Sequence, residues 1–220
     1  MIFEDREQAG LLLLEKLKKI KISRKNLIIV GIPRGGVMVA AQLARNLSVP
    51  LSIVVIKKLG APTNPELAIG ATASHGKPVL DHWLIRDLRV SSDFLKKEIL
   101  KKRKEARARE KLLGVEYSGD KFRGKTVVVV DDGLATGQTA KAAAHVLRQF
   151  GAKSLILAVP CAAPSTLEQI GGQYDRVICL EVNAHLEAVG QFYRDFRPVS
   201  DEEVRKLLRR TIDPTSSSKT

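Results

Sequence analysis

Short, nearly continuous apolar runs alternate along the chain with longer segments of helical periodicity. Because the runs are rich in Val and Ile and do not alternate with polar residues, they predict strands buried on both faces. The predicted strands span residues 26–32, 51–56, 68–73, 79–80, 125–130, 154–159 and 176–182. Helical segments separate most of these strands, which predicts an α/β fold with a mainly parallel central sheet flanked by helices.

Apolar residues at helical spacing predict the connecting elements. The predicted helices span residues 3–20, 37–47, 138–150, 164–171 and 200–210. The pattern is helical from Asp81 to Leu113, a segment longer than an ordinary connection, so we expect a helical insert there. Because neither a repeat nor a linker is recognisable, residues 1–212 are expected to form a single domain, and the polar residues 213–220 a disordered tail.

Composition sets limits on the class of protein. The chain has 220 residues, 44% of them hydrophobic, which is enough for one sizeable core. The apolar run from Leu11 to Leu14 is short and lies in a charged segment, and no apolar run approaches the roughly 18 residues of a membrane span. We therefore expect a cytoplasmic protein without a membrane contact.

The formal net charge of +13 suits an anionic ligand or nucleic acid. Much of the excess lies in Lys96–Lys111, which reads KKEILKKRKEARAREK. This run is typical either of a nucleic-acid contact or of a solvated helix face, where Glu98, Glu105 and Glu110 stand at pairing distance from the cations.

The segment Val127–Thr139, VVVVDDGLATGQT, places a turn of small residues between a predicted strand and a helix. Ligands of open α/β sheets bind at the carboxyl ends of strands. Small residues allow successive backbone N–H groups to converge on an anion at the positive end of the helix, and threonines add hydroxyl donors. A phosphate is the expected occupant, held by Gly133, Ala135, Thr136, Gly137 and Thr139.

The two carboxylates of this segment, Asp131 and Asp132, would repel a phosphate at a few ångströms. They are therefore expected to contact another part of the same ligand, either sugar hydroxyls or a metal. A ligand with a phosphate at one end and a vicinal diol in the middle is a ribose 5-phosphate.

The same 13 residues resemble the phosphoribosyl pyrophosphate (PRPP) signature of type I phosphoribosyltransferases. The resemblance implies that Asp131 and Asp132 contact the ribose hydroxyls and that Ala135–Thr139, including Gln138, binds the 5-phosphate. The segment GIPRGG, residues 31–36, is similar to the pyrophosphate loop of xanthine-guanine phosphoribosyltransferases. There the implied cation is Arg34, and the glycines that let the backbone approach the diphosphate are Gly35 and Gly36.

The segment KKLGAPTNPELAIG, residues 57–70, occupies the place of the family's mobile catalytic loop. Either Lys57 or Lys58 would then face the leaving pyrophosphate. Together with a late FYRDF, these motifs resemble a bacterial and archaeal branch of the family, and the likeness covers residues 3 to about 207.

The resemblance implies transfer of the 5-phosphoribosyl group from PRPP to a nitrogenous base, with Mg²⁺-assisted release of pyrophosphate. Mg²⁺ would be held mainly by PRPP, with Asp131 or Asp132 as the candidate protein ligand, and the catalytic candidates are Asp131, Asp132, Lys57 and Lys58. A homodimer is expected for this family. Purine enzymes usually carry a lysine where this chain has SLILAVPCAAP, and no lysine lies between Leu155 and Pro164, so the base is left open.

The hood that selects the base corresponds to residues about 183–199. The candidates to stack on the base are His185, Leu186, Phe192 and Tyr193, although side chains of these types also serve as ordinary packing. In the alternative function, the chain is a PRPP-sensing regulator of the same fold that binds nucleic acid through Lys101, Lys102, Arg103 and Lys104 of the basic insert.

Overall fold

The computed structural model describes residues 1–20, 22–115 and 119–212. The predicted disordered tail, residues 213–220, lies outside this range. The main sheet has five parallel strands in the order β2-β1-β6-β7-β8. Their bounds are β1 Leu27–Gly31, β2 Leu51–Ile53, β6 Thr126–Val130, β7 Ser154–Ala162 and β8 Arg176–Val182. The predicted α/β class with a parallel central sheet is confirmed.

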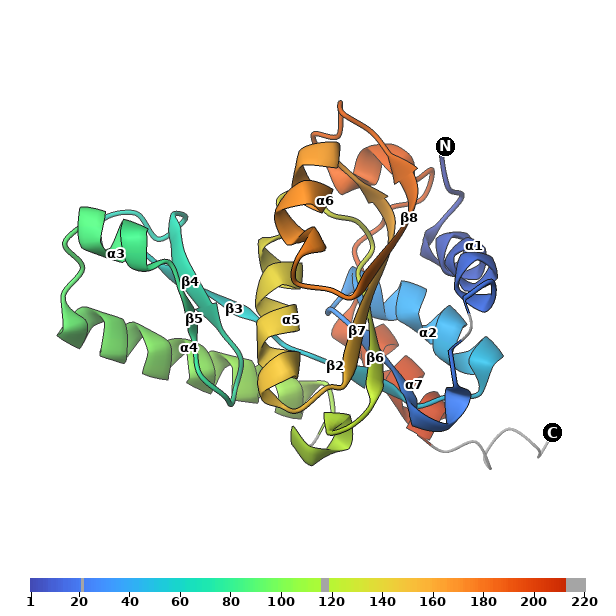
Figure 1. Cartoon of the computed structure of the whole chain (residues 1–220), viewed down its shortest axis with the longest axis horizontal. Helices are drawn as coiled ribbons and strands as arrows, with labels where there is room; N and C mark the ends of the chain where they lie inside the picture. Colours follow the sequence, from blue (N-terminus) through green and yellow to red (C-terminus); the bar gives the residue numbers. More distant parts are fainter. Residues whose placement is uncertain (21, 116–118, 213–220) are drawn as a thin grey trace.

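Helices cover both faces of this sheet (Figure 1). One face carries α1 (Arg6–Lys18), α2 (Gly35–Leu47) and α7 (Asp201–Ile212). The other face carries α5 (Gln138–Gln149) and α6 (Pro164–Gly171). The layers are therefore helix, sheet and helix.

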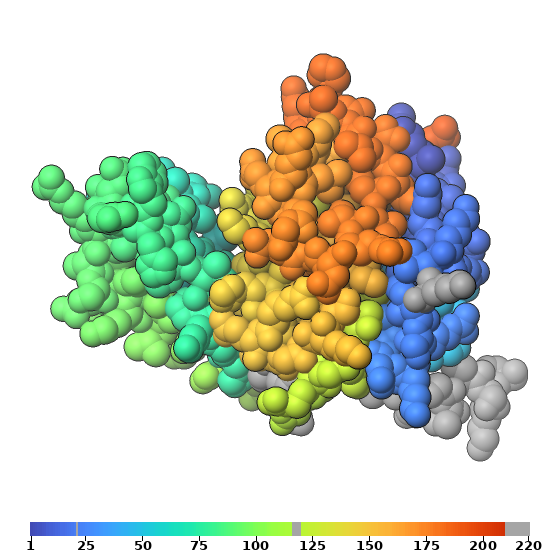
Figure 2. All heavy atoms as spheres, in the orientation of Figure 1, coloured from blue at the N-terminus to red at the C-terminus, as the bar shows by residue number. Residues whose placement is uncertain are grey.

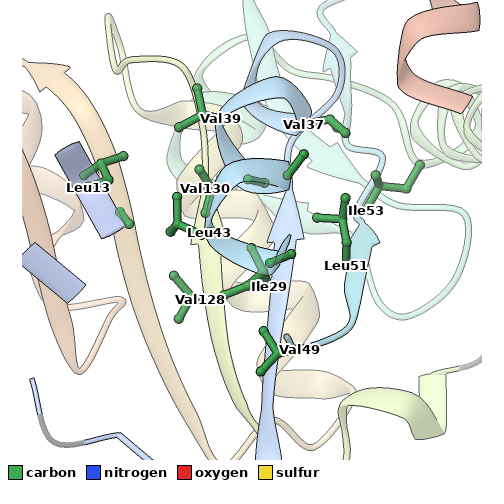
Figure 3. Close-up of a cluster of buried hydrophobic side chains, with 14 of the residues drawn as sticks. Leu13, Ile29, Val37, Val39, Leu43, Val49, Leu51, Ile53, Val128 and Val130 are labelled. Atoms are coloured by element: carbon green, nitrogen blue, oxygen red, sulfur yellow. The ribbon is translucent and has the colours of Figure 1, made fainter. Parts of the chain in front are cut away.

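Successive valines of β6 point to opposite faces of the sheet, and both faces are buried. Val128 and Val130 belong to the hydrophobic cluster beneath α2, part of which Figure 3 shows. Val127 and Val129 belong to the cluster beneath α5. Both faces of the strand are thus removed from water, which is the arrangement that parallel sheets require.

A smaller antiparallel sheet and two helices form a lobe beside the main sheet, here called the insert lobe (residues 57–112; Figures 1 and 2). Its strands are β3 (Lys57–Gly60), β4 (Ala68–Thr72) and β5 (Val79–Leu80). Residues 57–60 of the segment compared with the family's mobile loop are thus a strand paired with β4, with Leu59 buried in the core of the lobe.

The segment from Asp81 to Leu113 is helical as predicted, but it is not one helix. It is divided into α3 (His82–Asp87) and α4 (Ser92–Leu112). Asp81 and Ser91 accept hydrogen bonds from the first-turn amides of the two helices, and Arg89 between them has φ 49°. The chain therefore turns back, so that both helices pack on the small sheet.

The hood follows β8 and contains the 3₁₀ turn Val189–Phe192. Its chain lies beside the N-terminus, where the amide of Phe3 donates to the carbonyl of Phe192 over 2.8 Å. Short 3₁₀ turns also occur at Arg24–Asn26 and Gly119–Phe122. Among the described residues, no helix combines the length and the hydrophobicity needed to cross a bilayer.

Candidate functional site

A cavity of about 310 Å³ opens at the carboxyl ends of β1 and β6. Five segments meet there: the loop after β1, the residues from the end of β2 to the start of β3, helix α4, the turn after β6 and the first turn of α5. The lining residues are Ile32, Pro33, Arg34, Gly35, Val55, Ile56, Lys57, Arg109, Asp131, Asp132 and Thr139. Six of them, Arg34, Gly35, Lys57, Asp131, Asp132 and Thr139, are residues that the sequence analysis singled out.

The two carboxylates after β6 have different partners. Asp132 pairs with Arg6, whose Nε lies 2.8 Å from Oδ2, and its backbone carbonyl accepts a 2.6 Å hydrogen bond from the Tyr193 hydroxyl. The side chain of Asp131 accepts only a local hydrogen bond, from the Asp132 amide over 2.9 Å, among the contacts described. Burial raises the pKa of Asp131 well above its ordinary value, and the neighbouring Asp132 carboxylate adds to the rise.

Arg6 was not predicted as a site residue, yet it determines the position of Asp132. Its guanidinium stacks over the Phe196 ring at 3.9 Å from the centroid and also donates to the Arg197 carbonyl over 3.0 Å. It is buried, and a lone arginine in the first turn of a helix gives no sequence signal of such a role. Asp132 is therefore fixed by contacts with α1 and the hood.

The glycines of the GIPRGG loop allow close contact between α2 and the turn after β6. A Cβ on Gly35 would lie 1.8 Å from Oδ2 of Asp132, and one on Gly36 would lie 2.8 Å from Cα of Asp131. The sequence analysis assigned these glycines to the approach of a diphosphate. In the structure, the absence of a side chain at both glycines leaves room for Asp131 and Asp132 to lie against the loop.

Three cations face the cavity, each from a different element. Arg34 stands at the start of α2, after a cis peptide between Pro33 and Arg34, and its side chain is 48% exposed. Lys57 lies on β3, where its Nζ is 3.7 Å from Oε2 of Glu105. Arg109, on α4, was not predicted, because nothing in its sequence distinguishes it from the other cations of the basic run. The site thus offers positive charge opposite the carboxylates.

The turn Gly133–Gly137 leads from β6 into α5. Gly137 has φ 67°, and a Cβ there would lie 2.8 Å from Thr166 Cγ2. Thr166 Oγ1 donates to the carbonyl of Ala135 over 2.8 Å and holds the outer part of the turn. Ala135 and Thr136 are exposed, whereas Thr139 in the first turn of α5 lines the cavity.

Lys58 and Gln138 face a second cavity, of about 370 Å³, between the small sheet and α5. Neighbouring residues of a strand point to opposite sides, so Lys57 and Lys58 cannot both face the carboxylates. Lys57 lines the cavity that holds the two carboxylates, and Lys58 lines the second cavity.

The four hood candidates separate into two pairs. Phe192 and Tyr193 are 7% and 6% exposed and pack with Phe3, so neither ring is placed to stack on a base. This corrects the expectation for both, because the rings fill the core between the hood and α1. His185 is exposed and Leu186 is half-buried, and their base contact stays a prediction.

The basic run of the insert is partly engaged within the lobe. Lys102 pairs with Glu98 and Glu105, and Arg103 donates to the carbonyl of Gly76. Lys101 and Lys104 are exposed on α4. A nucleic-acid contact through these residues stays a prediction.

Comparison with known proteins decides the family. A model described as phosphoribosyl transferase domain matches residues 7–197. The chain belongs to the phosphoribosyl transferase family. The match spans the GIPRGG loop, the insert lobe and the acidic turn, and the resemblance to type I phosphoribosyltransferases is confirmed.

Two similar proteins illustrate the extent of the likeness. "Putative phosphoribosyl transferase Rv0571c" of Mycobacterium tuberculosis is 38% identical in an alignment of 218 residues that covers 95% of this chain and 47% of that protein. The chain thus spans about half the length of the curated relatives it matches. The crystal structure of TT1426 from Thermus thermophilus is 38% identical, with a TM-score of 0.82, and the match covers 94% of this chain and 98% of that one.

Proposed function

We propose that the protein transfers the 5-phosphoribosyl group of PRPP to a nitrogenous base and releases pyrophosphate. The observation that carries this proposal is the charge distribution in the 310 Å³ cavity. Asp131 and Asp132 stand after β6, while Arg34 and Lys57 stand on other walls. A ligand with hydroxyls in the middle and phosphates at the ends matches this distribution.

Each part of PRPP then has a partner. The amides of the exposed residues Ala135 and Thr136, with the Thr139 hydroxyl, bind the 5-phosphate at the positive end of α5. Asp131 accepts hydrogen bonds from the ribose hydroxyls. Arg34 and Lys57 bind the diphosphate.

Mg²⁺ fits this site as an ion shared with the ligand. Among the described residues, no group of three or more His, Cys, Asp or Glu side chains could hold a metal. Mg²⁺ is often bound by one or two carboxylates together with substrate phosphates, and Asp131 is the carboxylate without a cationic partner in hydrogen-bond contact. When bound, the ion neutralises part of the diphosphate charge.

The residues of this chain would act mainly by position and charge. Transfer breaks the bond between ribose C1 and the diphosphate oxygen and forms a bond from C1 to a nitrogen of the base. Arg34 and Lys57 stabilise the negative charge that grows on the leaving diphosphate. Asp131 holds the ribose while C1 passes through a cation-like state, so the aligned reactants meet without a covalent enzyme intermediate.

The test is pyrophosphate release from PRPP and Mg²⁺ across a panel of purines, pyrimidines and other nitrogen bases. Release that depends on one base, and that is lost in the double variant Asp131→Asn with Asp132→Asn, is the expected result. Asp120→Asn, at a carboxylate that is 86% exposed, is the matched control. Unchanged release in a folded double variant would refute the site assignment.

If PRPP raises the melting temperature while no base stimulates release, the PRPP-sensing regulator becomes the better account. In that case RNA and DNA binding should fall steeply with salt and weaken in Lys101→Gln with Lys104→Gln.

A further inference from the structure

Arg109, at the wall of the proposed PRPP site, is paired with the carboxylate of Asp201. Its two terminal nitrogens donate to the two carboxylate oxygens of Asp201, the first residue of α7. Nη1 of Arg34 lies 4.0 Å from Oδ1 of the same carboxylate. Asp201 therefore sits between two guanidinium groups, and both of these groups line the cavity.

The arrangement is accessible to a ligand. The side chains of Arg109 and Asp201 are 24% and 30% exposed, so water and small anions can reach the pair. The hydrogen bonds from Arg109 lower the pKa of Asp201, so this group is an anion at neutral pH. The planar fork of a guanidinium fits a phosphate as well as it fits a carboxylate.

We infer that Arg109 is a further diphosphate-binding residue, supplied by the insert lobe, and that Asp201 is the anion it releases when the diphosphate binds. The inference rests on the proposed function, because it assumes that the diphosphate lies in this cavity. A diphosphate carries more negative charge than one carboxylate, so exchange at two guanidinium groups favours the ligand.

A purely structural account of the Arg109–Asp201 pair predicts different behaviour. If the pair only ties α4 to α7, removing Arg109 lowers the melting temperature and leaves ligand binding unchanged. If Arg109 binds the diphosphate, its removal weakens ligands that carry this group and spares those that lack it. Inorganic pyrophosphate, PRPP and ribose 5-phosphate form the required series.

The experiment is titration calorimetry of these three ligands, with Mg²⁺ present, on the full chain. For Arg109→Gln we expect pyrophosphate and PRPP to bind at least about ten-fold more weakly, because charge-assisted hydrogen bonds are lost, while ribose 5-phosphate binding is unchanged. Arg107→Gln, which removes an exposed arginine on the same helix outside the cavity wall, controls for long-range charge. Equal binding of pyrophosphate by Arg109→Gln and Arg107→Gln would overturn the inference.

Asp201→Asn tests the exchange itself. Removing the competing anion should tighten pyrophosphate binding by about two- to five-fold, the range expected for a partly exposed ion pair. In the double variant Arg109→Gln with Asp201→Asn, binding should stay at least about ten-fold weaker than in Asp201→Asn alone. Recovery of wild-type affinity in the double variant would mean that Arg109 only restrains Asp201, which refutes direct contact.

The binding readout separates this inference from the proposed function. If the wild type binds PRPP and pyrophosphate but no base stimulates turnover, the transferase proposal fails and the role of Arg109 is still decided by the variants. If the wild type binds neither ligand, both fail. Arg109→Lys keeps the positive charge but lacks the planar fork, so pyrophosphate binding between that of the wild type and that of Arg109→Gln supports a bidentate contact. The melting temperature of each variant shows whether it is folded.

Discussion

The main sheet and the insert lobe differ in how many apolar side chains they bury. The parallel strands are covered on both faces, and their clusters contain many fully buried residues from six or more elements. The insert lobe's own hydrophobic cluster is much smaller: its buried members are Leu59, Ala61 and Ile69, with partly buried side chains from α3 and α4 around them. Both regions nevertheless supply charged groups to one cavity.

The difference indicates how the site is divided. Asp131, Asp132 and Arg34 are attached to the well-buried main sheet, while Lys57 and Arg109 are attached to the less buried lobe. Local opening costs least free energy where few apolar groups are buried. We therefore expect the ribose and 5-phosphate contacts to be rigid and the lobe's diphosphate contacts to be the ones that form and break during turnover.

The largest effect is expected from a truncation in the main sheet. Leu157→Ala in β7 removes a fully buried side chain and should lower the free energy of unfolding by about 4 kcal/mol, since the rigid surroundings cannot collapse on the cavity. Denaturant unfolding measures this change. If Leu157→Ala lowered the free energy of unfolding no more than a substitution at an exposed position does, the difference in burial between the two regions would be contradicted.

A truncation in the lobe should be milder and local. Leu59→Ala should cost about 2 kcal/mol, because the small core can partly close around the gap. Hydrogen exchange should accelerate in β3 and β4 and stay unchanged in β6 and β7, with weaker pyrophosphate binding and unchanged ribose 5-phosphate binding. Uniform acceleration across both sheets would show that the lobe is not a separate unit of stability.

The junction between the two regions can be tested at Gly35. Gly35→Ala places a methyl group 1.8 Å from Oδ2 of Asp132, so the Arg6–Asp132 pair must shift. We expect a loss of about 1–2 kcal/mol in stability from overpacking and weaker PRPP binding by calorimetry. Gly171→Ala, whose Cβ would have no atom within 4 Å, is the control and should change neither quantity.

The smallest effect is a gain of stability at the site. Burial raises the pKa of Asp131, so the folded state binds a proton more tightly than the unfolded state, and stability falls as pH rises from about 3.8 upward. Asp131→Asn removes this dependence and should raise the free energy of unfolding at pH 7, with no gain below pH 3.8, as denaturant unfolding at the two pH values would measure. Asp132→Asn, which breaks the pair with Arg6, should instead destabilise at pH 7.

Several elements follow directly from local sequence. The valines of β6 predict a strand buried on both faces because every side chain is apolar, and the small residues of Gly133–Gly137 predict a turn after it. The helix bounds differ from the prediction mainly at the ends, as at α1, where Asp5 caps the helix after the predicted start. The strand Lys57–Gly60 was missed, because its two lysines conceal the strand pattern until β4 pairs with it.

The sequence by itself determined the family, the parallel sheet and the position of the acidic turn, since each depends on residues adjacent in the chain. Only the tertiary structure added Arg6 and Arg109 to the cations near that turn and decided between Lys57 and Lys58. Arg6, Lys57 and Arg109 come from three separate elements, and nothing adjacent to Arg6 or Arg109 in the sequence distinguishes them from other basic residues. Side chains that are distant in sequence are brought together only by packing, so their partnership depends on the fold.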